Sequence, residues 1–282
     1  MTGFININKE KGATSAQEVN KIKRLTGSPC GHMGTLDPMA SGVLPIAMGN
    51  AARLFDYFLD KQKTYIADFR FGVDSDTLDI TGTLCENVGR VPDIAEIEAV
   101  TGNFVGETEQ IPPKYSAKNV NGKRGYELAR AGVQFELAPK KVKIYSIKFI
   151  KKTDNDVFRF EIVCGGGTYI RSIARDMGKA LDTFAVMSAL ERTQSGIFSI
   201  ENSVQTRSLT AENINDYIIP TESVLPYESI VPDKKAAEKL FNGLSVPCER
   251  PDGIYKIFTS NNSFYGLAEV NKSVLKVGKK LC

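Results

Sequence analysis

Several features that mark common classes of protein are missing from this sequence. No apolar run approaches the ~18 residues that are needed to cross a bilayer. The first twelve residues are soon charged and hold no long apolar core, so we expect no secretory signal. The five cysteines are odd in number, widely spaced and without a CxxC pair. This usage argues against a disulfide framework or a zinc site and favours reduced thiols in the cytoplasm.

Familiar catalytic and binding motifs are also absent. His32 is the only histidine, and nothing around it has the signature of Ser-His-Asp chemistry; a lone histidine is more often structural than catalytic. Asp74, Asp76 and Asp79 cluster without the spacing or terminal Glu of an EF-hand, which favours a turn or polar network over a metal site. Gly165–Gly167 lack the GK[ST] of a phosphate loop. They predict a tight turn into a helix, whose start could still meet a phosphate.

Positive charge is concentrated in one part of the chain. The whole sequence of 282 residues carries +3, but residues 113–152 hold eleven Lys or Arg and two Glu, a local balance of +9. The remainder is therefore −6. Clustered cations suit a polyphosphate partner, although a solvated lysine-rich face has the same composition. Tyr115, Tyr126 and Tyr145 are interleaved with the cations, which favours nucleic acid.

Hydrophobic periodicity predicts an α+β protein with a sheet, and the length allows two domains. Strands are expected where apolar residues alternate, and helices where they recur at helical spacing after a capping residue. Beyond residue 228, a helix followed by short strands with an Asn-rich turn predicts a small, mostly β unit. The expected strands are 4–9, 64–73 and 157–164; the expected helices lie in 14–27, 92–104 and 165–181, and a long loop with a short helix is expected in 112–132.

One carboxylate stands alone in GHMGTLDPMASGVLPI, residues 31–46. Aspartate before proline often starts a turn, and aspartates in loops mostly hydrogen-bond to the nearby backbone. The alternative is a carboxylate that burial has adapted for chemistry. The residues alone favour the turn.

Four motifs together resemble one family, the TruB-type tRNA pseudouridine synthases, which isomerise uridine 55 in the T loop of tRNA. The likeness spans roughly residues 4–200. It implies a pseudouridine-synthase fold with a mixed, largely antiparallel sheet over residues 1–228, and a short PUA-like RNA-binding domain over 229–282. The motifs are GHMGTLDPMASGVLPI, KTYIADFRFGVDSDTLDITG, PPKYSAKNVNGKRGYELARAG and GGGTYIRSIARDMG, in this order.

Three positions depart from the family pattern. Glu10 stands where proline is usual, Met33 replaces the common threonine, and Glu191 stands where a basic residue is frequent. These differences bear on RNA contacts and leave the aspartate unaffected.

The resemblance makes Asp37 the catalytic group. Pseudouridine formation breaks the N1–C1′ bond, turns the uracil and rejoins it through C5, without redox change, energy donor, metal or other cofactor. A carboxylate could attack the sugar or stabilise positive charge on it, and the sequence does not choose between a covalent and a glycal intermediate. Arg171 would pair with Asp37 and keep it ionised.

The resemblance also implies how the substrate is held. Tyr65 would stack on the target uracil, and Tyr169 and Leu190 would line its pocket. A uridine inside the T loop must be extruded, and His32 would fill the stacking position that it leaves. A basic RNA-binding loop at about 113–141, or the wider charged segment 113–152, would close over the T arm. Its expected phosphate contacts are Lys114, Lys118, Lys123 and Arg124.

Three functions remain open at this point. The first is a tRNA-modifying enzyme that works in the cytoplasm as a monomer, needs no protein partner and binds no membrane. The second is a guide-RNA-dependent relative, which shares the catalytic motifs but requires partner proteins. The third is a non-catalytic RNA chaperone, an activity that could also coexist with catalysis.

Overall fold

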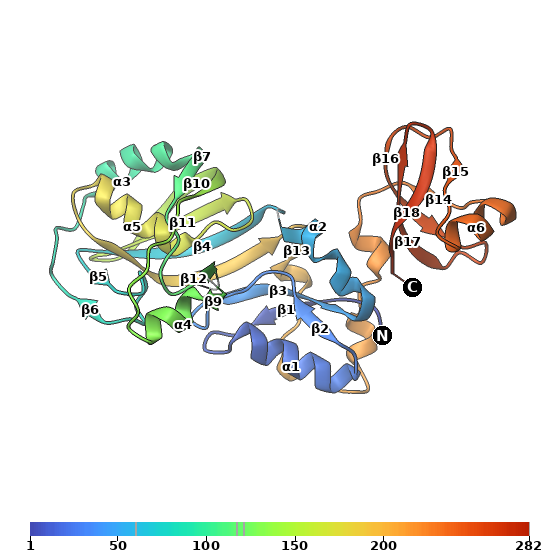
Figure 1. The fold of residues 1–282 in the computed structure, drawn as a ribbon. Helices are drawn as coiled ribbons and strands as arrows, with labels where there is room; N and C mark the ends of the chain where they lie inside the picture. The colour runs from blue at the N-terminus through green and yellow to red at the C-terminus, as the bar shows by residue number, and fades with distance from the viewer. Residues whose placement is uncertain (60, 117, 121, 282) are drawn as a thin grey trace.

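The computed structural model describes residues 1–59, 61–116, 118–120 and 122–281. It contains a nine-stranded mixed sheet and, at the C-terminal end of the chain, a separate five-stranded sheet (Figure 1). The predicted α+β class with a mixed, largely antiparallel sheet is confirmed. No helix among the described residues is long and apolar enough to cross a membrane.

The large sheet carries the strands that position the candidate site. Its order is β1-β3-β12-β4-β11-β10-β7, with β2 beside β3 and β13 beside β12. Every pairing is antiparallel except that of β3 with β12. The bounds are β1 Gly3–Lys9, β2 Cys30–His32, β3 Ser41–Met48, β4 Lys63–Phe71, β7 Gly106–Gln110, β10 Lys140–Asp154, β11 Val157–Cys164, β12 Ala185–Ser195 and β13 Phe198–Ser199.

The main helices pack on this sheet and begin where the sequence predicts. Thr14 caps α1 (Ser15–Thr26) through a capping box with Gln17, and Gly27 ends it in the left-handed conformation at φ 65°. Helix α3 (Ile94–Thr101) packs against β10, and α5 (Ile170–Ala180) packs against β12. The predicted strands and helices of residues 4–181 are therefore confirmed in kind, with bounds that differ by a few residues.

Short elements connect these layers. Two of the loops form their own two-stranded pairs, β5 with β6 and β8 with β9. The bounds are α2 Phe55–Leu59, β5 Asp74–Ser75, β6 Leu84–Cys85, β8 Asn119–Val120, β9 Lys123–Arg124 and α4 Gly125–Arg130.

The basic segment is only partly a loop. Residues 140–152 belong to β10, so the prediction of one closing loop over 113–152 is wrong for this part, and the narrower range of 113–141 ends inside the strand. Val142, Ile144 and Ile147 are buried on one side of β10, while Lys141 and Lys143 are exposed. These lysines lie on the solvent side of a core strand.

The C-terminal sheet has its own apolar core and also shares one with the large sheet. Leu267 and Leu281 pack in a cluster with Phe4, Leu54 and Phe198. The predicted helix and short strands are confirmed, whereas the division into a catalytic and a PUA-like domain at residue 228 stays a prediction. The elements are β14 Ser229–Ile230, α6 Lys234–Phe241, β15 Val246–Pro247, β16 Gly253–Phe258, β17 Phe264–Asn271 and β18 Val274–Lys280.

Candidate active site

Asp37 lies in the turn that joins β2 to β3. Its backbone carbonyl accepts a hydrogen bond from the Ala40 amide at 3.0 Å, so the local turn expected from Asp-Pro is present. Ser15 at the start of α1 both donates to and accepts from the Leu36 backbone at 2.9 Å. This fixes the backbone beside Asp37, whose side chain points away from the turn and remains 32% exposed. The aspartate thus serves the turn with its backbone and leaves its carboxylate for another partner.

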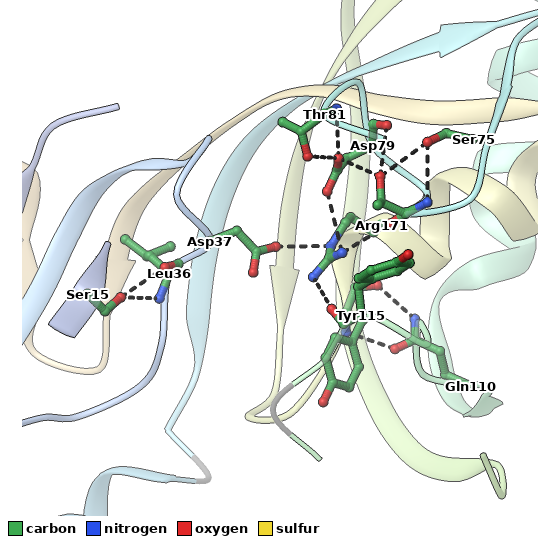
Figure 2. Close-up of polar contacts among 11 residues, drawn as sticks. Ser15, Leu36, Asp37, Ser75, Asp79, Thr81, Gln110, Tyr115 and Arg171 are labelled. Carbon is green, nitrogen blue, oxygen red and sulfur yellow. Dashed lines mark hydrogen bonds and ion pairs between the residues drawn. The ribbon is translucent and has the colours of Figure 1, made fainter. Parts of the chain in front are cut away.

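That partner is Arg171, in the first turn of α5 (Figure 2). Its Nε lies 3.0 Å from Asp37 Oδ2, so the predicted pair is confirmed. The other nitrogens of the guanidinium are also engaged, because Nη1 donates to the Thr77 carbonyl and Nη2 to the Tyr115 carbonyl, both at 3.0 Å. With 7% of its side chain exposed, Arg171 is held on several sides and presents a fixed face to Asp37.

Asp79 is a second carboxylate on the same arginine. Its Oδ2 lies 3.4 Å from Arg171 Nη1, and its Oδ1 accepts hydrogen bonds from Thr77 and Thr81. The polar-network interpretation of the acidic cluster is confirmed, but the sequence did not indicate that Asp79 reaches the candidate site. Among the residues that the structure describes, no three His, Cys, Asp or Glu side chains are grouped as a metal site.

The electrostatics of Asp37 combine opposing effects. Burial raises the pKa of the Asp37 carboxyl above its usual range, and the charge of Asp79 adds to this rise. Arg171 and the buried Lys9 counteract it. The expectation that Arg171 favours the ionised carboxylate therefore holds in direction, while burial has the larger effect.

The residues expected to line a pocket come from three elements around this pair. Tyr65 on β4 and Leu190 on β12 are buried in one apolar cluster with Leu36, the residue before Asp37. Burial raises the pKa of the Tyr65 hydroxyl. Tyr169 is half-buried just before α5, and its backbone exchanges two hydrogen bonds, of 2.8 and 3.1 Å, with the Gln110 side chain. Tyr65 is close enough to Asp37 for the aspartate charge to act on its hydroxyl, and Tyr169 lies two residues before Arg171. The substrate contacts of all three residues stay predictions.

His32 ends β2, opposite Ile46 of β3. Its Nδ1 is buried and has no hydrogen-bond partner among the described residues. Burial and the positive charge of Arg192 lower the pKa of this imidazole, which favours its neutral form. A neutral ring is suited to stacking, although its expected role as a plug is untested.

The four expected phosphate contacts lie in the loop that carries β8 and β9. Lys114, Lys123 and Arg124 are exposed, whereas Lys118 is half-buried and donates to the Ala138 carbonyl at 3.3 Å. The loop is tied to the candidate site because the Tyr115 carbonyl accepts from Arg171. Residues 117 and 121 of this loop lie outside the described part of the chain.

Two family models match the chain in succession. Residues 23–170 match the TruB family pseudouridylate synthase (N terminal domain), and residues 171–231 match the tRNA pseudouridylate synthase B C-terminal domain. Two similar relatives are both named tRNA pseudouridine synthase B. The one from Clostridium novyi is 39% identical over 100% of both chains, and the one from Clostridium kluyveri is 38% identical over 95% of both.

The fold of this chain is also similar to that of Cbf5 chains in solved complexes. A Cbf5-Nop10-Gar1 complex contains a chain that is 25% identical, with a TM-score of 0.72, covering 99% of this chain and 85% of that one. The archaeal box H/ACA sRNP Nop10-Cbf5 complex gives 26% identity and a TM-score of 0.70, covering 99% of this chain and 86% of that one.

Proposed function

Because the chain belongs to the TruB family of pseudouridylate synthases, we propose that it isomerises uridine 55 in the T loop of tRNA, with Asp37 as the catalytic carboxylate. Its enzyme class is that of a tRNA pseudouridine synthase, an isomerase. What we propose beyond this class is that the modified nucleotide is uridine 55 and that Asp37 is the catalytic residue. The observation that carries it is the 3.0 Å ion pair of Asp37 with a buried, fully engaged Arg171.

The pair supports a reaction at the ribose. Arg171 contacts Oδ2 and leaves Oδ1 without a hydrogen-bond partner among the described residues. Oδ1 is therefore the oxygen that we expect to approach C1′, as a nucleophile or as a counter-charge, while the N1–C1′ bond breaks. The uracil then turns and C5 bonds to C1′, which breaks the C1′–O bond and frees the carboxylate if one had formed; the C5 proton is lost and N1 gains a proton.

The surrounding side chains suit an extruded base. Base flipping costs roughly a few kcal/mol, part of which stacking in a pocket offsets. We expect the Tyr65 ring to stack on the uracil, with Leu190 and Tyr169 beside it. Neutral His32, on the same chain segment as Asp37, would take the position that the uridine vacates in the T loop.

We propose that the chain acts alone on tRNA, as a monomer in the cytoplasm. The relatives named tRNA pseudouridine synthase B match over the full chain at up to 39% identity, whereas the Cbf5 chains of the Cbf5-Nop10-Gar1 and Nop10-Cbf5 complexes reach 25–26%. The higher identity supports a stand-alone enzyme over a guide-RNA-dependent one.

One experiment separates these functions. The purified chain is incubated with an unmodified tRNA transcript, without guide RNA or other protein, and pseudouridine is mapped by position. We expect a single new pseudouridine at position 55. Modification that requires an added guide RNA and partner proteins would identify a guide-dependent enzyme, and binding without any pseudouridine would identify a chaperone.

A tRNA-folding activity is a second proposal. The exposed cations Lys114, Lys123 and Arg124 offer contacts to RNA that do not involve the carboxylate of Asp37. An Asp37→Asn variant should then refold a misfolded tRNA as fast as the wild type. A refolding rate no faster than that of tRNA alone, for both proteins, would contradict this activity.

A further inference from the structure

Arg192 on β12 is the largest fully buried side chain among the described residues, with 1% of its surface exposed. Its guanidinium donates to three backbone carbonyls in the segment around Asp37. Nε donates to Val43 at 2.7 Å, Nη2 to Gly34 at 3.0 Å and Nη1 to Thr35 at 3.4 Å. These carbonyls lie on both sides of Asp37 in the sequence. One side chain is therefore hydrogen-bonded to the backbone before and after the turn that carries Asp37.

The backbone of Arg192 is joined to the same turn and to the pocket wall. In the sheet, Arg192 is paired with Gly42 of β3 on one side and with Tyr65 of β4 on the other. The approach to β3 is so close that a Cβ on Gly42 would lie 2.3 Å from the Arg192 carbonyl oxygen. The Arg192 guanidinium also lies close enough to the Tyr65 side chain for its charge to lower the pKa of the Tyr65 hydroxyl, against the larger rise that burial causes. Arg192 therefore contacts the turn of Asp37 through its side chain and the strand of Tyr65 through its backbone.

Burying the Arg192 cation between β3 and β4 costs desolvation free energy that an apolar side chain would not cost. Among the described residues, no carboxylate lies within ion-pair distance of Arg192, so hydrogen bonds to backbone carbonyls replace its hydration. An apolar side chain of similar volume commonly stabilises such a site as well or better. What an apolar side chain lacks is the rigid fork of donors that can hold several carbonyls in fixed relative positions. The arrangement therefore favours a role in geometry over a role in packing.

We propose that Arg192 is a positioning residue, which fixes the turn of Asp37 against the pocket wall formed by Tyr65 and Leu190. The inference rests on the proposed catalytic role of Asp37. Leu190 lies two residues before Arg192 on the same strand, β12. This strand therefore carries both a residue of the pocket wall and the residue that holds the turn of Asp37. Displacing a reacting group by about 1 Å can cost roughly a hundredfold in rate. RNA contacts made elsewhere on the surface should be unaffected.

The test separates catalysis from binding. Arg192→Lys keeps the charge but loses the fork, Arg192→Gln keeps donors but loses the charge, and Arg192→Met keeps the volume alone. Single-turnover rates with enzyme in excess and the Kd for tRNA are measured for each, and circular dichroism checks folding. We expect rates that fall by roughly tenfold to a hundredfold, most for Met, with Kd changed by less than about threefold.

Arg159→Lys is the matched control. Arg159 on β11 makes a bidentate ion pair with Asp68, with N–O distances of 2.7 and 2.8 Å, on a more exposed part of the same sheet. The change also removes a fork and keeps a charge, and both rate and Kd should stay near those of the wild type.

Three results would overturn the proposal. They are folded Arg192 variants with wild-type rates, a fall in rate matched by an equal fall in affinity, and failure of all three variants to fold. The last would make Arg192 a stability residue. An inactive wild type would instead count against the proposed function itself, so the two failures are distinguishable.

Discussion

The burial of Asp37 opposes the ionisation that its proposed role requires. Its partial withdrawal from water raises its pKa, yet the proposed reaction uses the ionised form. Arg171 limits the rise, and Arg171 is itself held by Asp79 and by two backbone carbonyls. The fixed cation thus favours the ionised aspartate that the proposed reaction uses, against the larger effect of burial.

Replacing Asp37 with Asn should abolish isomerisation and leave tRNA binding nearly unchanged. The amide has a similar shape but can neither attack the sugar nor offset positive charge on it. Single-turnover rates and filter-binding affinities measure the two effects separately. Residual turnover within about tenfold of the wild type, which is roughly 1.4 kcal/mol of barrier, would exclude an essential role for the carboxylate.

The same substitution should stabilise the protein at neutral pH. Because the pKa of Asp37 is raised in the folded state, ionisation lowers stability as the pH rises from about 4, the usual pKa of an unfolded Asp, through the raised folded value. We expect equal thermal unfolding midpoints for the wild type and Asp37→Asn near pH 3, and a higher midpoint for the variant at pH 7. Asp56→Asn, at an exposed side chain, is the control. A wild type that is more stable than Asp37→Asn at pH 7 would show that the ion pair outweighs burial.

The sequence predicted one half of the site and missed the other. Asp37 and Arg171 lie in motifs that could be recognised, and their contact is confirmed. Arg192 and Lys9 were not found in this way, because each is a buried cation bound to backbone carbonyls rather than to an acidic side chain. Arg192 binds carbonyls of a segment distant in sequence, and Lys9 binds those of nearby Glu10 and Ala13 and of Pro38. Such partners leave no local pattern of residue types.

At the scale of elements, local signals predicted the helices better than they predicted the charged strand. The capping box and terminal glycine of α1 act within a few residues and are legible in the sequence. In β10 the lysine count concealed an alternation of buried Val142 and Ile144 with exposed lysines, which was the signal for a strand. Charge describes what a segment presents to solvent, whereas its alternation decides whether it joins a sheet.

The loop of β8 and β9 should supply more RNA affinity than the lysines of β10. We expect the combined change Lys118→Ala, Lys123→Ala and Arg124→Ala to weaken tRNA binding. Each cation that no longer neutralises a phosphate should reduce the slope of log K against log salt by about 0.7 to 0.9. Turnover at saturating tRNA should recover in part, since Asp37 is untouched.

The control for this change removes the same charge from β10. Its substitutions are Lys148→Ala, Lys151→Ala and Lys152→Ala, all at exposed positions near the end of the strand. If the slope of log K against log salt is unchanged in the loop variant, the cations of the loop do not contact phosphates and the loop is a solvated face. If both variants reduce the slope equally, only the total charge of the protein determines the salt dependence.

At the scale of the whole molecule, the proposed chemistry is complete without a cofactor. Isomerisation needs no redox change, and the groups that would act are side chains of the chain itself. Activity should therefore survive exhaustive EDTA treatment when the tRNA has first been refolded. Activity that disappears, and that returns only with added metal on an RNA shown to stay folded, would contradict this expectation.

The two sheets are joined through the apolar cluster that contains Leu267, Leu281, Phe4 and Leu54. The C-terminal sheet also has a separate core of its own, which includes Leu275. Leu267 and Leu275 are each 2% exposed, yet they lie in different clusters. Equal truncations at these positions therefore distinguish the junction between the sheets from the interior of the smaller one.

Leu267→Ala should loosen both sheets, and Leu275→Ala should loosen only the C-terminal one. Either truncation leaves a cavity that costs about 2–5 kcal/mol. In the first variant the cavity is shared with Phe4 on β1, so hydrogen exchange should accelerate in β1 as well as in β16–β18. In the second, the cavity lies inside the C-terminal sheet's own core, and exchange in β1 should stay at the wild-type rate. Peptide-resolved hydrogen exchange measures both. Identical patterns in the two variants would show that the chain opens as one unit, and would contradict the division proposed near residue 228.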